Sequence, residues 1–273
     1  MPNLDFTTFA QEVAREAGAI LLQYQAKGVT PEYKGAADVV TAADRASEKH
    51  VVSRLRDSFP SHSIVAEEGS GVDNGSEYCW HIDPLDGTTN FAHGFPIWCT
   101  SIGLEKNGEG LVGVVYDPTR DELFMAEKGA GAYLNNRRIH VSNVDKLENG
   151  LFATGFPPAN RRTNPNVFYF HQFSALSHGA RRAGSAALDL CAVAAGRLEG
   201  FWEFGLQSWD VSAGATIVME AGGKVTDLKG GPYRSTDRNV NASNGKVHQQ
   251  MLDLFAKLER GEFPAGVPPI PKQ

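Results

Sequence analysis

The apolar residues near the start of the chain recur every three or four positions, which is the spacing of an amphipathic helix. These positions are Phe6, Phe9, Val13, Ala17, Ile20, Leu21 and Tyr24. A second helix is expected over 41–59, because Thr41 is a good N-terminal cap and Pro60 cannot continue a helix. Its buried face is predicted to carry Ala46, His50, Val51 and Leu55.

Beyond this helix the pattern changes to short apolar runs broken by turn residues, which predicts strands. The predicted strands are HSIVAEE (62–68), YCWHID (78–83), TSIGLEK (100–106), GLVGVVYD (110–117), ELFMAEK (122–128), GAYLNN (131–136) and GLFATGF (150–156). Helical patterns return over 166–178, 185–198, 210–222 and 247–260.

Because helices and strands mix throughout, we expect an α/β or α+β protein with a mixed sheet. We predict two layered halves, 1–145 and 146–265, and an exposed Pro-rich tail over 266–273.

The acidic net charge of the chain argues against two classes of binding partner. The chain has 273 residues, a net charge of −6 and a sequence pI near 5.8. Nucleic acids and anionic membranes need a basic face, so neither is an expected partner. Three arginine pairs, Arg137–Arg138, Arg161–Arg162 and Arg181–Arg182, are candidates for a local anion patch or for plain solvated surface.

The cysteines and the N-terminal segment bear on the compartment. Cys79, Cys99 and Cys191 are odd in number and widely spaced, which favours free thiols in a reducing compartment. The first residues contain acids and no long apolar run, so neither a signal peptide nor a membrane anchor is expected. We therefore predict a cytoplasmic protein.

Several familiar motifs are absent or have a plain explanation. GEGLVG (108–113) matches the dinucleotide pattern, but the glycines precede a predicted strand, so a hairpin turn is expected instead. There is no P-loop, no G-x-S-x-G and no H-E-x-x-H, and the histidines are not paired as zinc ligands.

Two of the predicted strands end in acids. Glu67 and Glu68 close one and Asp83 closes the next, followed by Asp86. Each pair can also be a solvated charge pair or a turn, and for Glu67–Glu68 this reading stays open. In DPLDGTTN (83–90), however, the proline restricts the preceding aspartate, the glycine lets the backbone approach a ligand, and Thr-Thr-Asn begins a helix whose N–H groups favour phosphate.

Carboxylates gathered beside a phosphate cradle, without soft ligands, indicate a hard cation such as Mg²⁺. Two unit charges about 4 Å apart repel by roughly 4 kcal/mol at an effective dielectric constant of 20. The cluster is therefore costly unless cations neutralise it.

These segments and others resemble the inositol monophosphatase family of Mg²⁺-dependent, lithium-sensitive phosphomonoesterases. WHIDPLDGTTNFAHGFP (80–96) is similar to the first signature of that family, and SWDVSAGATIVMEAGG (208–223) to the second. KGAADVVTAAD (34–44), FPSHSIVAEE (59–68) and AGSAALDLCAVAAGRLEGFWE (183–203) also match in order. The resemblance implies a layered α/β/α/β/α sandwich like that of fructose-1,6-bisphosphatase.

The resemblance also implies a metal-binding set. Glu67, Asp83 and the backbone carbonyl of Leu85 would hold one Mg²⁺, and Asp83, Asp86 and Asp210 a second. Glu67 would also reach a third, weaker ion, with Glu68 beside its water shell.

The implied catalytic residues are Thr88, Asp44 and Glu67: Thr88, oriented by Asp44, would polarise the attacking water. The N–H groups of Gly87 and Thr88 would bind the phosphate.

The substrate alcohol would meet Asp86, Ala186 and Glu203, and Asp210 completes the implied substrate-binding set. Taken without the family, Asp210 would be an N-terminal helix cap and Glu203 a surface salt-bridge acid. His81 and Ser212 depart from the family pattern, in which these positions are more often apolar or small.

The expected activity is hydrolysis of a small polyol phosphate monoester, with myo-inositol 1-phosphate first. Rival substrates within the superfamily are histidinol phosphate, fructose 1,6-bisphosphate, nucleotide 3′-phosphates and NADP. A binding protein of the transcription machinery and a structural metal-binding protein are the readings outside this class. Family members are usually dimers, so a homodimer is expected.

Overall fold

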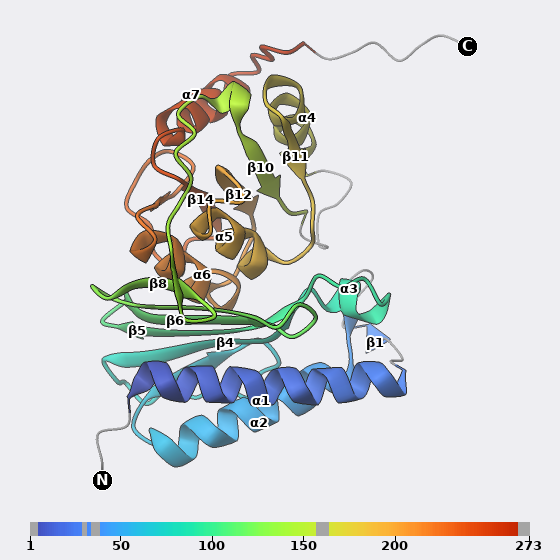
Figure 1. The fold of residues 1–273 in the computed structure, drawn as a ribbon, viewed down its shortest axis with the longest axis vertical. Helices are drawn as coiled ribbons and strands as arrows, with labels where there is room; N and C mark the ends of the chain where they lie inside the picture. The colour runs from blue at the N-terminus through green and yellow to red at the C-terminus, as the bar shows by residue number, and fades with distance from the viewer. Residues whose placement is uncertain (1–4, 29–31, 34–38, 157–163, 267–273) are drawn as a thin grey trace.

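Two large β-sheets and three layers of helices alternate through the described part of the molecule, beside a small two-stranded pair (Figure 1). The computed structural model describes residues 5–28, 32–33, 39–156 and 164–266. Arg161–Arg162, the start of KGAADVVTAAD (34–38) and the tail beyond 266 lie outside the described residues. The observed order of layers confirms the α/β/α/β/α sandwich expected from the sequence.

The first sheet has seven strands in the described part of the chain, in the order β3-β4-β5-β6-β7-β8-β9. Only β3 and β4 pair in parallel, and the other neighbours are antiparallel. The strands are β3 (Ser63–Ala66), β4 (Tyr78–Asp86), β5 (Cys99–Lys106), β6 (Glu109–Asp117), β7 (Glu122–Glu127), β8 (Gly131–Leu134) and β9 (Arg137–Ile139). Helices α1 (Phe6–Lys27) and α2 (Ala42–Ser58) cover its outer face (Figure 1).

The second sheet has five strands within the described ranges, in the order β11-β10-β12-β14-β13. They are β10 (Leu151–Thr154), β11 (Gly179–Arg181), β12 (Gly200–Phe204), β13 (Lys224–Thr226) and β14 (Asn239–Ser243). Helices α5 (Ala186–Ala194) and α6 (Ser208–Glu220) lie between the sheets, and α4 (Asn166–Leu176) and α7 (His248–Glu259) lie outside the second one. The remaining elements are β1 (Glu32–Tyr33), β2 (Val39–Val40), α3 (Thr88–Ala92) and the 3₁₀ turn Leu147–Asn149.

The long helices, strands β3 to β8 and strand β10 lie where the hydrophobic pattern placed them, and GEGLVG enters β6 from a hairpin turn as expected. Strands β12 and β14 were not predicted. The predicted face of α2 was partly wrong. Ala46 and His50 lie at the edge of the helix, and the buried face carries Ala43, Asp44, Ser47, Glu48, Val51, Val52 and Leu55. The helix therefore turns polar groups inward, toward the end of β4.

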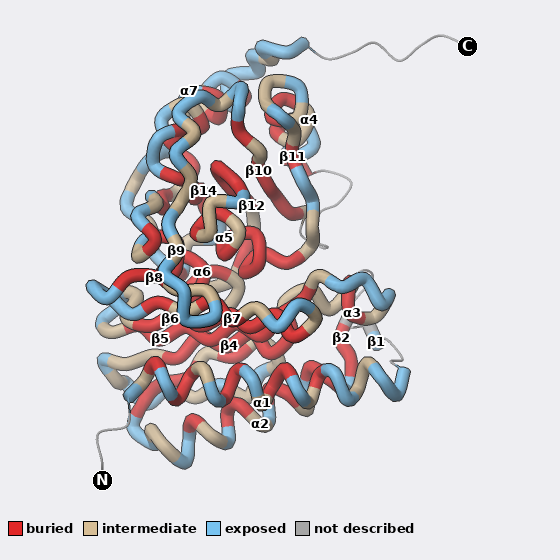
Figure 2. The backbone as a smooth tube through the Cα atoms, in the orientation of Figure 1, coloured by how far each residue is buried: buried red, intermediate tan, exposed pale blue. Residues whose placement is uncertain are grey.

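The strands of the first sheet end before residue 140 and those of the second begin after residue 150. The division into halves 1–145 and 146–265 agrees with this boundary and stays a prediction. The largest buried cluster lies between the sheets and includes α5 and α6, and Figure 2 shows these helices as mostly buried. The middle layer is thus the core that both sheets share.

Helix α6 packs directly on the backbone of the first sheet. A Cβ atom added to Gly103 would lie 2.5 Å from the Ser212 hydroxyl oxygen, and one added to Gly113 would lie 2.4 Å from the carbonyl oxygen of Ala213. The absence of side chains at these two strand positions lets the helix approach closely. The glycines on the sheet therefore set how closely α6 can approach it.

We expect Gly113→Ala to lower the stability of the protein by about 1–3 kcal/mol, because the added methyl meets helix backbone that cannot move away alone. Thermal unfolding of the purified variant measures the change. Glu109→Ala, on the same strand, is the control, since Glu109 is 74% exposed and its ion pair with Lys128 contributes little. Equal melting temperatures for the two variants would contradict this account of the packing.

Candidate active site

Three of the predicted site acids lie at one edge of the first sheet. Glu67 follows β3, and Asp83 and Asp86 lie in the last part of β4. Because β3 and β4 run in parallel, their carboxyl ends meet at the same edge. The Glu67 N–H donates to the carbonyl oxygen of Ile82 at 3.2 Å, which holds the two strand ends together.

The backbone of the DPLD segment is held on several sides. The Asp83 carboxylate accepts a hydrogen bond from the Leu85 N–H at 2.9 Å. The carbonyl oxygen of Pro84 accepts hydrogen bonds from the hydroxyls of Ser47 (3.2 Å) and Thr100 (3.1 Å). The pairing with β5 shifts register at this point, which leaves room for both aspartates to face the same side.

Thr88 and Asp44, which the family resemblance pairs, are in contact. Gly87 has φ 97°, a left-handed conformation that turns the chain from β4 into α3. The Thr88 hydroxyl lies 3.0 Å from Asp44 Oδ1 and 3.0 Å from the Leu85 carbonyl oxygen. Burial raises the pKa of Asp44, and hydrogen bonds from Thr41 and Thr88 offset this only in part.

Asp86 connects the first sheet to helix α5. Its Oδ2 accepts hydrogen bonds from the Ser185 hydroxyl and from the Ala187 N–H, both at 2.7 Å. Ala186, the first residue of α5, lies between these two donors. Burial raises the pKa of Asp86, and the hydrogen bonds from α5 oppose the shift.

Asp210 reaches the same place from α6. It is the third residue of that helix, and its Oδ2 accepts a hydrogen bond from the N–H of Gln207, the cap, at 2.7 Å. The carboxylate therefore helps to close the helix start without itself being the N-cap residue. Burial and the charge of Asp86 raise its pKa to about 7.

Glu203 comes from β12 in the second sheet and is 7% exposed, which does not fit the alternative of a surface salt-bridge acid. A Cβ atom on Gly155 would lie 2.2 Å from both of its carboxylate oxygens, so the glycine makes room for the acid. Burial, followed by the charges of Asp210 and Asp189, raises its pKa, and Arg182 only partly offsets them.

Asp83 lies at the electrostatic centre of this group. Burial is the largest influence that raises its pKa, followed by the charges of Glu67, Asp86 and Asp210. Within the described ranges no three Asp, Glu, His or Cys side chains converge as a finished metal-ion cluster. The fit to a cation therefore rests on donor type and charge: carboxylate and carbonyl oxygens, mutually repelling and buried, suit a hard divalent ion.

Sequence reasoning missed several residues that build the site. Glu48, which is buried on α2, accepts hydrogen bonds from the N–H groups of Glu68 (2.7 Å) and Ser70 (2.9 Å) and so shapes the turn after β3. Ala187 and the buried acid Asp189 on α5 were also not singled out. An acid on the inward face of a predicted helix was the one available signal for Glu48.

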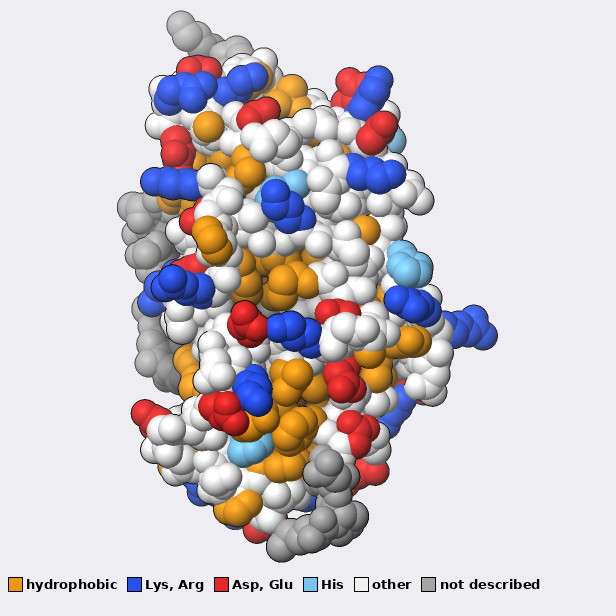
Figure 3. All heavy atoms as spheres, turned by 90° about the vertical axis from the view of Figure 1, so that its left-hand side faces the viewer, with side chains coloured by type: hydrophobic (Ala, Val, Ile, Leu, Met, Phe, Trp, Pro, Cys, Tyr) orange, Lys and Arg blue, Asp and Glu red, His pale blue; other side chains and the backbone are white. Residues whose placement is uncertain are grey.

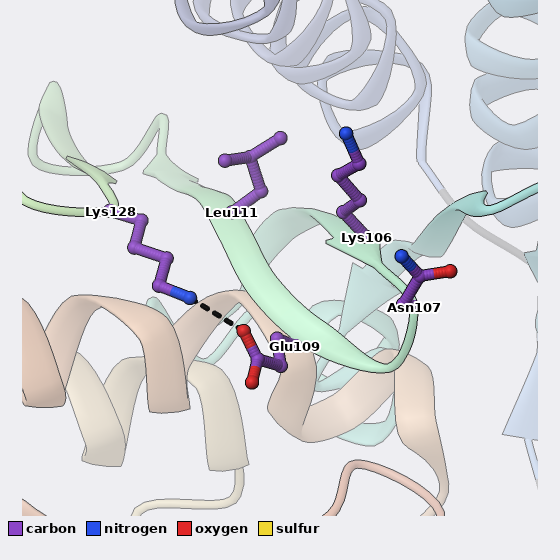
Figure 4. A pocket seen from close by; sticks show the side chains of 5 residues that line it. All are labelled: Lys106, Asn107, Glu109, Leu111 and Lys128. Atoms are coloured by element: carbon purple, nitrogen blue, oxygen red, sulfur yellow. Dashed lines mark hydrogen bonds and ion pairs between the residues drawn. The ribbon is translucent and has the colours of Figure 1, made fainter.

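A separate pocket lies at the other end of β5, and Figure 4 shows the side chains that line it. It is lined by Lys106, Asn107, Glu109, Leu111 and Lys128. Lys128 is paired with Glu109 at 2.6 Å, so this charge is already satisfied by a neighbour. The strand places this pocket far along β5 from Cys99, which pairs with Asp86, and it belongs to no part of the candidate site.

Comparison with known proteins decides the family. The model of the inositol monophosphatase family matches residues 3–260. The chain belongs to the inositol monophosphatase family. Membership supports a phosphatase activity, and the phosphatases of this family are generally Mg²⁺-dependent.

Individual relatives carry two kinds of name. The chain is 44% identical to an inositol-1-monophosphatase of Synechocystis over 90% of this chain and 87% of that protein. It is 43% identical to the Nus factor SuhB of Pseudomonas aeruginosa over 89% of this chain and 93% of that protein. The solved inositol monophosphatase from Anabaena (Nostoc) has a TM-score of 0.84 and 44% identity, covering 92% of this chain and 95% of that one.

Among the helices that the structure describes, none has both the length and the apolar character needed to cross a bilayer.

The crowding of carboxylates predicts that removing one negative charge stabilises the metal-free protein. When folding raises the pKa of a carboxyl group, the folded protein becomes less stable as the pH rises above the pKa that the group has in the unfolded chain. Ionised Asp83 therefore destabilises the folded protein at neutral pH when no cation is bound. In chelator at pH 7.5, Asp83→Asn should raise the melting temperature by roughly 2–6 °C, since ~1 kcal/mol corresponds to about 2–4 °C in a chain of this size. Differential scanning calorimetry measures it.

The control for this charge removal is Asp57→Asn, at an exposed position near the end of α2, which should leave the melting temperature within about 1–2 °C of wild type. Adding millimolar Mg²⁺ should stabilise wild type more than Asp83→Asn. A lower melting temperature for Asp83→Asn in chelator would show that the carboxylate is not under electrostatic stress.

Proposed function

We propose that this chain hydrolyses a small polyol phosphate monoester in a Mg²⁺-dependent reaction, with myo-inositol 1-phosphate as the leading substrate. The observation that supports this most is the burial of Asp83, Asp86, Asp210 and Glu203 near enough for their charges to act on one another. Buried acids that raise one another's pKa are typical of a site that receives cations and a substrate.

The proposed metal ligands are those implied by the family resemblance. Glu67, Asp83 and the Leu85 carbonyl would hold one Mg²⁺, Asp83, Asp86 and Asp210 a second, and Glu67 would contribute to a third. Bound Mg²⁺ lowers the pKa of water and stabilises charge on phosphate and leaving-group oxygens. The chain itself contributes ligands fixed by hydrogen bonds to Leu85, Ala187 and Gln207.

Thr88 is proposed to orient the attacking water. Its hydroxyl donates to Asp44, and Asp44 is fixed in turn by the N–H and hydroxyl of Thr41, at 2.8 and 2.6 Å. The Thr88 oxygen can then accept a hydrogen bond from water and keep it in line with phosphorus. The N–H groups of Gly87 and Thr88 are proposed to bind phosphate oxygens, and Glu67 assists in activating the water.

The alcohol end of the substrate is proposed to meet Asp86, Ala186 and Glu203. Glu203 offers acceptor oxygens at the end of β12, where a hydroxyl of a polyol can donate. The relatives named as inositol-1-monophosphatases favour inositol as that polyol, and the other superfamily substrates are the alternatives.

A second candidate is a role in transcription, favoured by the relatives named Nus factor SuhB. On the face in Figure 3, basic and acidic side chains are interspersed, so no broad basic field for nucleic acid lies there. A protein partner suits that surface better than a nucleic acid. The homodimer and the cytoplasmic location stay predictions.

The first test is phosphate release from myo-inositol 1-phosphate with Mg²⁺, alongside histidinol phosphate, fructose 1,6-bisphosphate, a nucleotide 3′-phosphate and NADP. Thr88→Val should lower kcat by about 10²–10⁴-fold because it removes the group that orients the water. Thr8→Val, at an exposed hydroxyl of α1, is the matched control. Preference for another ester would replace inositol as the substrate, and release from none would leave the transcription role in the lead.

The acids also predict a pH dependence. Protons compete with cations for a carboxylate whose pKa is raised, and that of Asp210 is about 7 without metal. The Mg²⁺ concentration for half-maximal activity should therefore rise as pH falls from 8 to 6, by up to about tenfold per pH unit for each proton displaced. Mg²⁺ titrations at several pH values measure this. The same half-maximal concentration at pH 8 and pH 6 would contradict the proposed ligand set.

A further inference from the structure

His81 and Ser212, the two departures from the family pattern, are part of one buried polar cluster. His81 lies on β4 and Ser212 on α6, and Glu105 on β5 joins them. His81 Nε2 lies 3.3 Å from Glu105 Oε2, and the Ser212 hydroxyl donates to Glu105 Oε1 at 2.9 Å. On the other side of the ring, His81 Nδ1 lies 2.9 Å from the Ser208 hydroxyl. We call these four residues, His81, Glu105, Ser208 and Ser212, the β4–β5–α6 clamp.

The two ionisable side chains of the clamp, His81 and Glu105, are buried. His81 is 5% exposed and Glu105 is 7% exposed. Burial alone lowers the pKa of His81, but hydrogen bonds with Cys79 and Glu105 outweigh it and raise the pKa to about 9. Each ring nitrogen of His81 has a partner, Nε2 with Glu105 and Nδ1 with Ser208. Buried polar groups cost free energy unless such partners are in place, so these contacts favour one arrangement of the strands and the helix.

The clamp lies on the same two elements as two of the proposed ligands. His81 is two residues before Asp83 on β4, and side chains at that spacing face the same side of a strand. Ser208 and Ser212 are four residues apart and flank Asp210 along the helix. The strand that carries Asp83 and the helix that carries Asp210 are thus joined by contacts at residues two positions from each acid along the chain.

Helix α6 is held in this region by apolar packing of residues such as Val211 and Ala213, by the hydrogen bond from the Ser101 hydroxyl to the Trp209 carbonyl oxygen, and by the clamp. Gly103, which pairs with His81 across the strands, has no side chain, and the helix backbone passes directly over it. A glycine surface allows close approach but does not by itself select how far the helix slides or rotates. Polar groups that bond across it do so.

We propose that the β4–β5–α6 clamp positions Asp210 relative to Asp83, so that its members are positioning residues for cation binding at the site. The inference rests on the proposed function, because it takes these two acids as ligands. Groups that orient metal ligands through hydrogen bonds commonly affect metal affinity by about 10–100-fold when removed. The clamp should therefore act on Mg²⁺ affinity more than on folding.

Ser212→Ala and His81→Leu test this, since each removes one arm of the clamp. Mg²⁺ binding by isothermal titration calorimetry should weaken about 10-fold or more, with kcat recovered at saturating Mg²⁺. Glu105→Gln is the conservative variant, because an amide can still accept from His81 and bond Ser212, and it should keep Mg²⁺ affinity within about threefold of wild type. Thr216→Val is the matched control: Thr216 lies one turn further along α6 and its hydroxyl donates to the Ser212 carbonyl oxygen, outside the clamp.

The outcomes separate the proposals. A lower melting temperature with wild-type Mg²⁺ affinity in Ser212→Ala and His81→Leu would overturn the positioning role and leave a structural one. Equal loss of affinity in Thr216→Val would overturn it too, since any change in α6 would then suffice. Mg²⁺ binding by wild type without phosphate release from any ester would contradict the proposed function alone, and the clamp would still be judged by calorimetry. Absence of Mg²⁺ binding by wild type would overturn both.

Discussion

Like charges brought together out of water are the constraint on which the site depends. At about 4 Å, two carboxylates repel by roughly 4 kcal/mol even at an effective dielectric constant of 20. The chain tolerates this because each acid is fixed by donors: Leu85 N–H for Asp83, Ser185 and Ala187 for Asp86, and the N–H of Gln207 for Asp210. The acids therefore keep their places while their charge remains available to a ligand.

The layered fold is what brings these acids together. β3 and β4 deliver Glu67, Asp83 and Asp86 to one sheet edge because they are parallel. The middle layer then supplies Asp210 from the first turn of α6 and the donors to Asp86 from the first turn of α5. Two helix starts and two strand ends are thus turned toward the same side of the layers, which is a consequence of chain direction.

Much of this could be predicted from the sequence where the signal was long or repeated. Helical periodicity over many residues placed α1, α6 and α7, and the acids at the ends of two apolar runs indicated the site. Strands β9, β11 and β13 have three residues each, too short for an alternating pattern to appear. Their pairing depends on partners far away in the chain, which local composition does not record.

The site was predictable only in part for a similar reason. Motif spacing identified the acids and Thr88, but roles such as that of Glu48 follow from which face of a helix turns inward. The periodicity of α2 was misjudged there, because its buried face includes Asp44, Ser47 and Glu48, and polar residues are normally assigned to solvent. The contact between His81 and Glu105 joins two strands by a diagonal that the sequence alone does not show.

The hydrogen bonds from α5 to Asp86 have a consequence for cooperativity. Asp86 belongs to the first sheet, and Ser185 and Ala187 belong to a helix packed against the second, so one carboxylate joins both parts of the molecule. A ligand that fixes Asp86 then favours the state in which the two parts are docked, by thermodynamic linkage. Substitutions far from any acid that weaken this docking should therefore lower the affinity for the ligand, although they remove no contact with it.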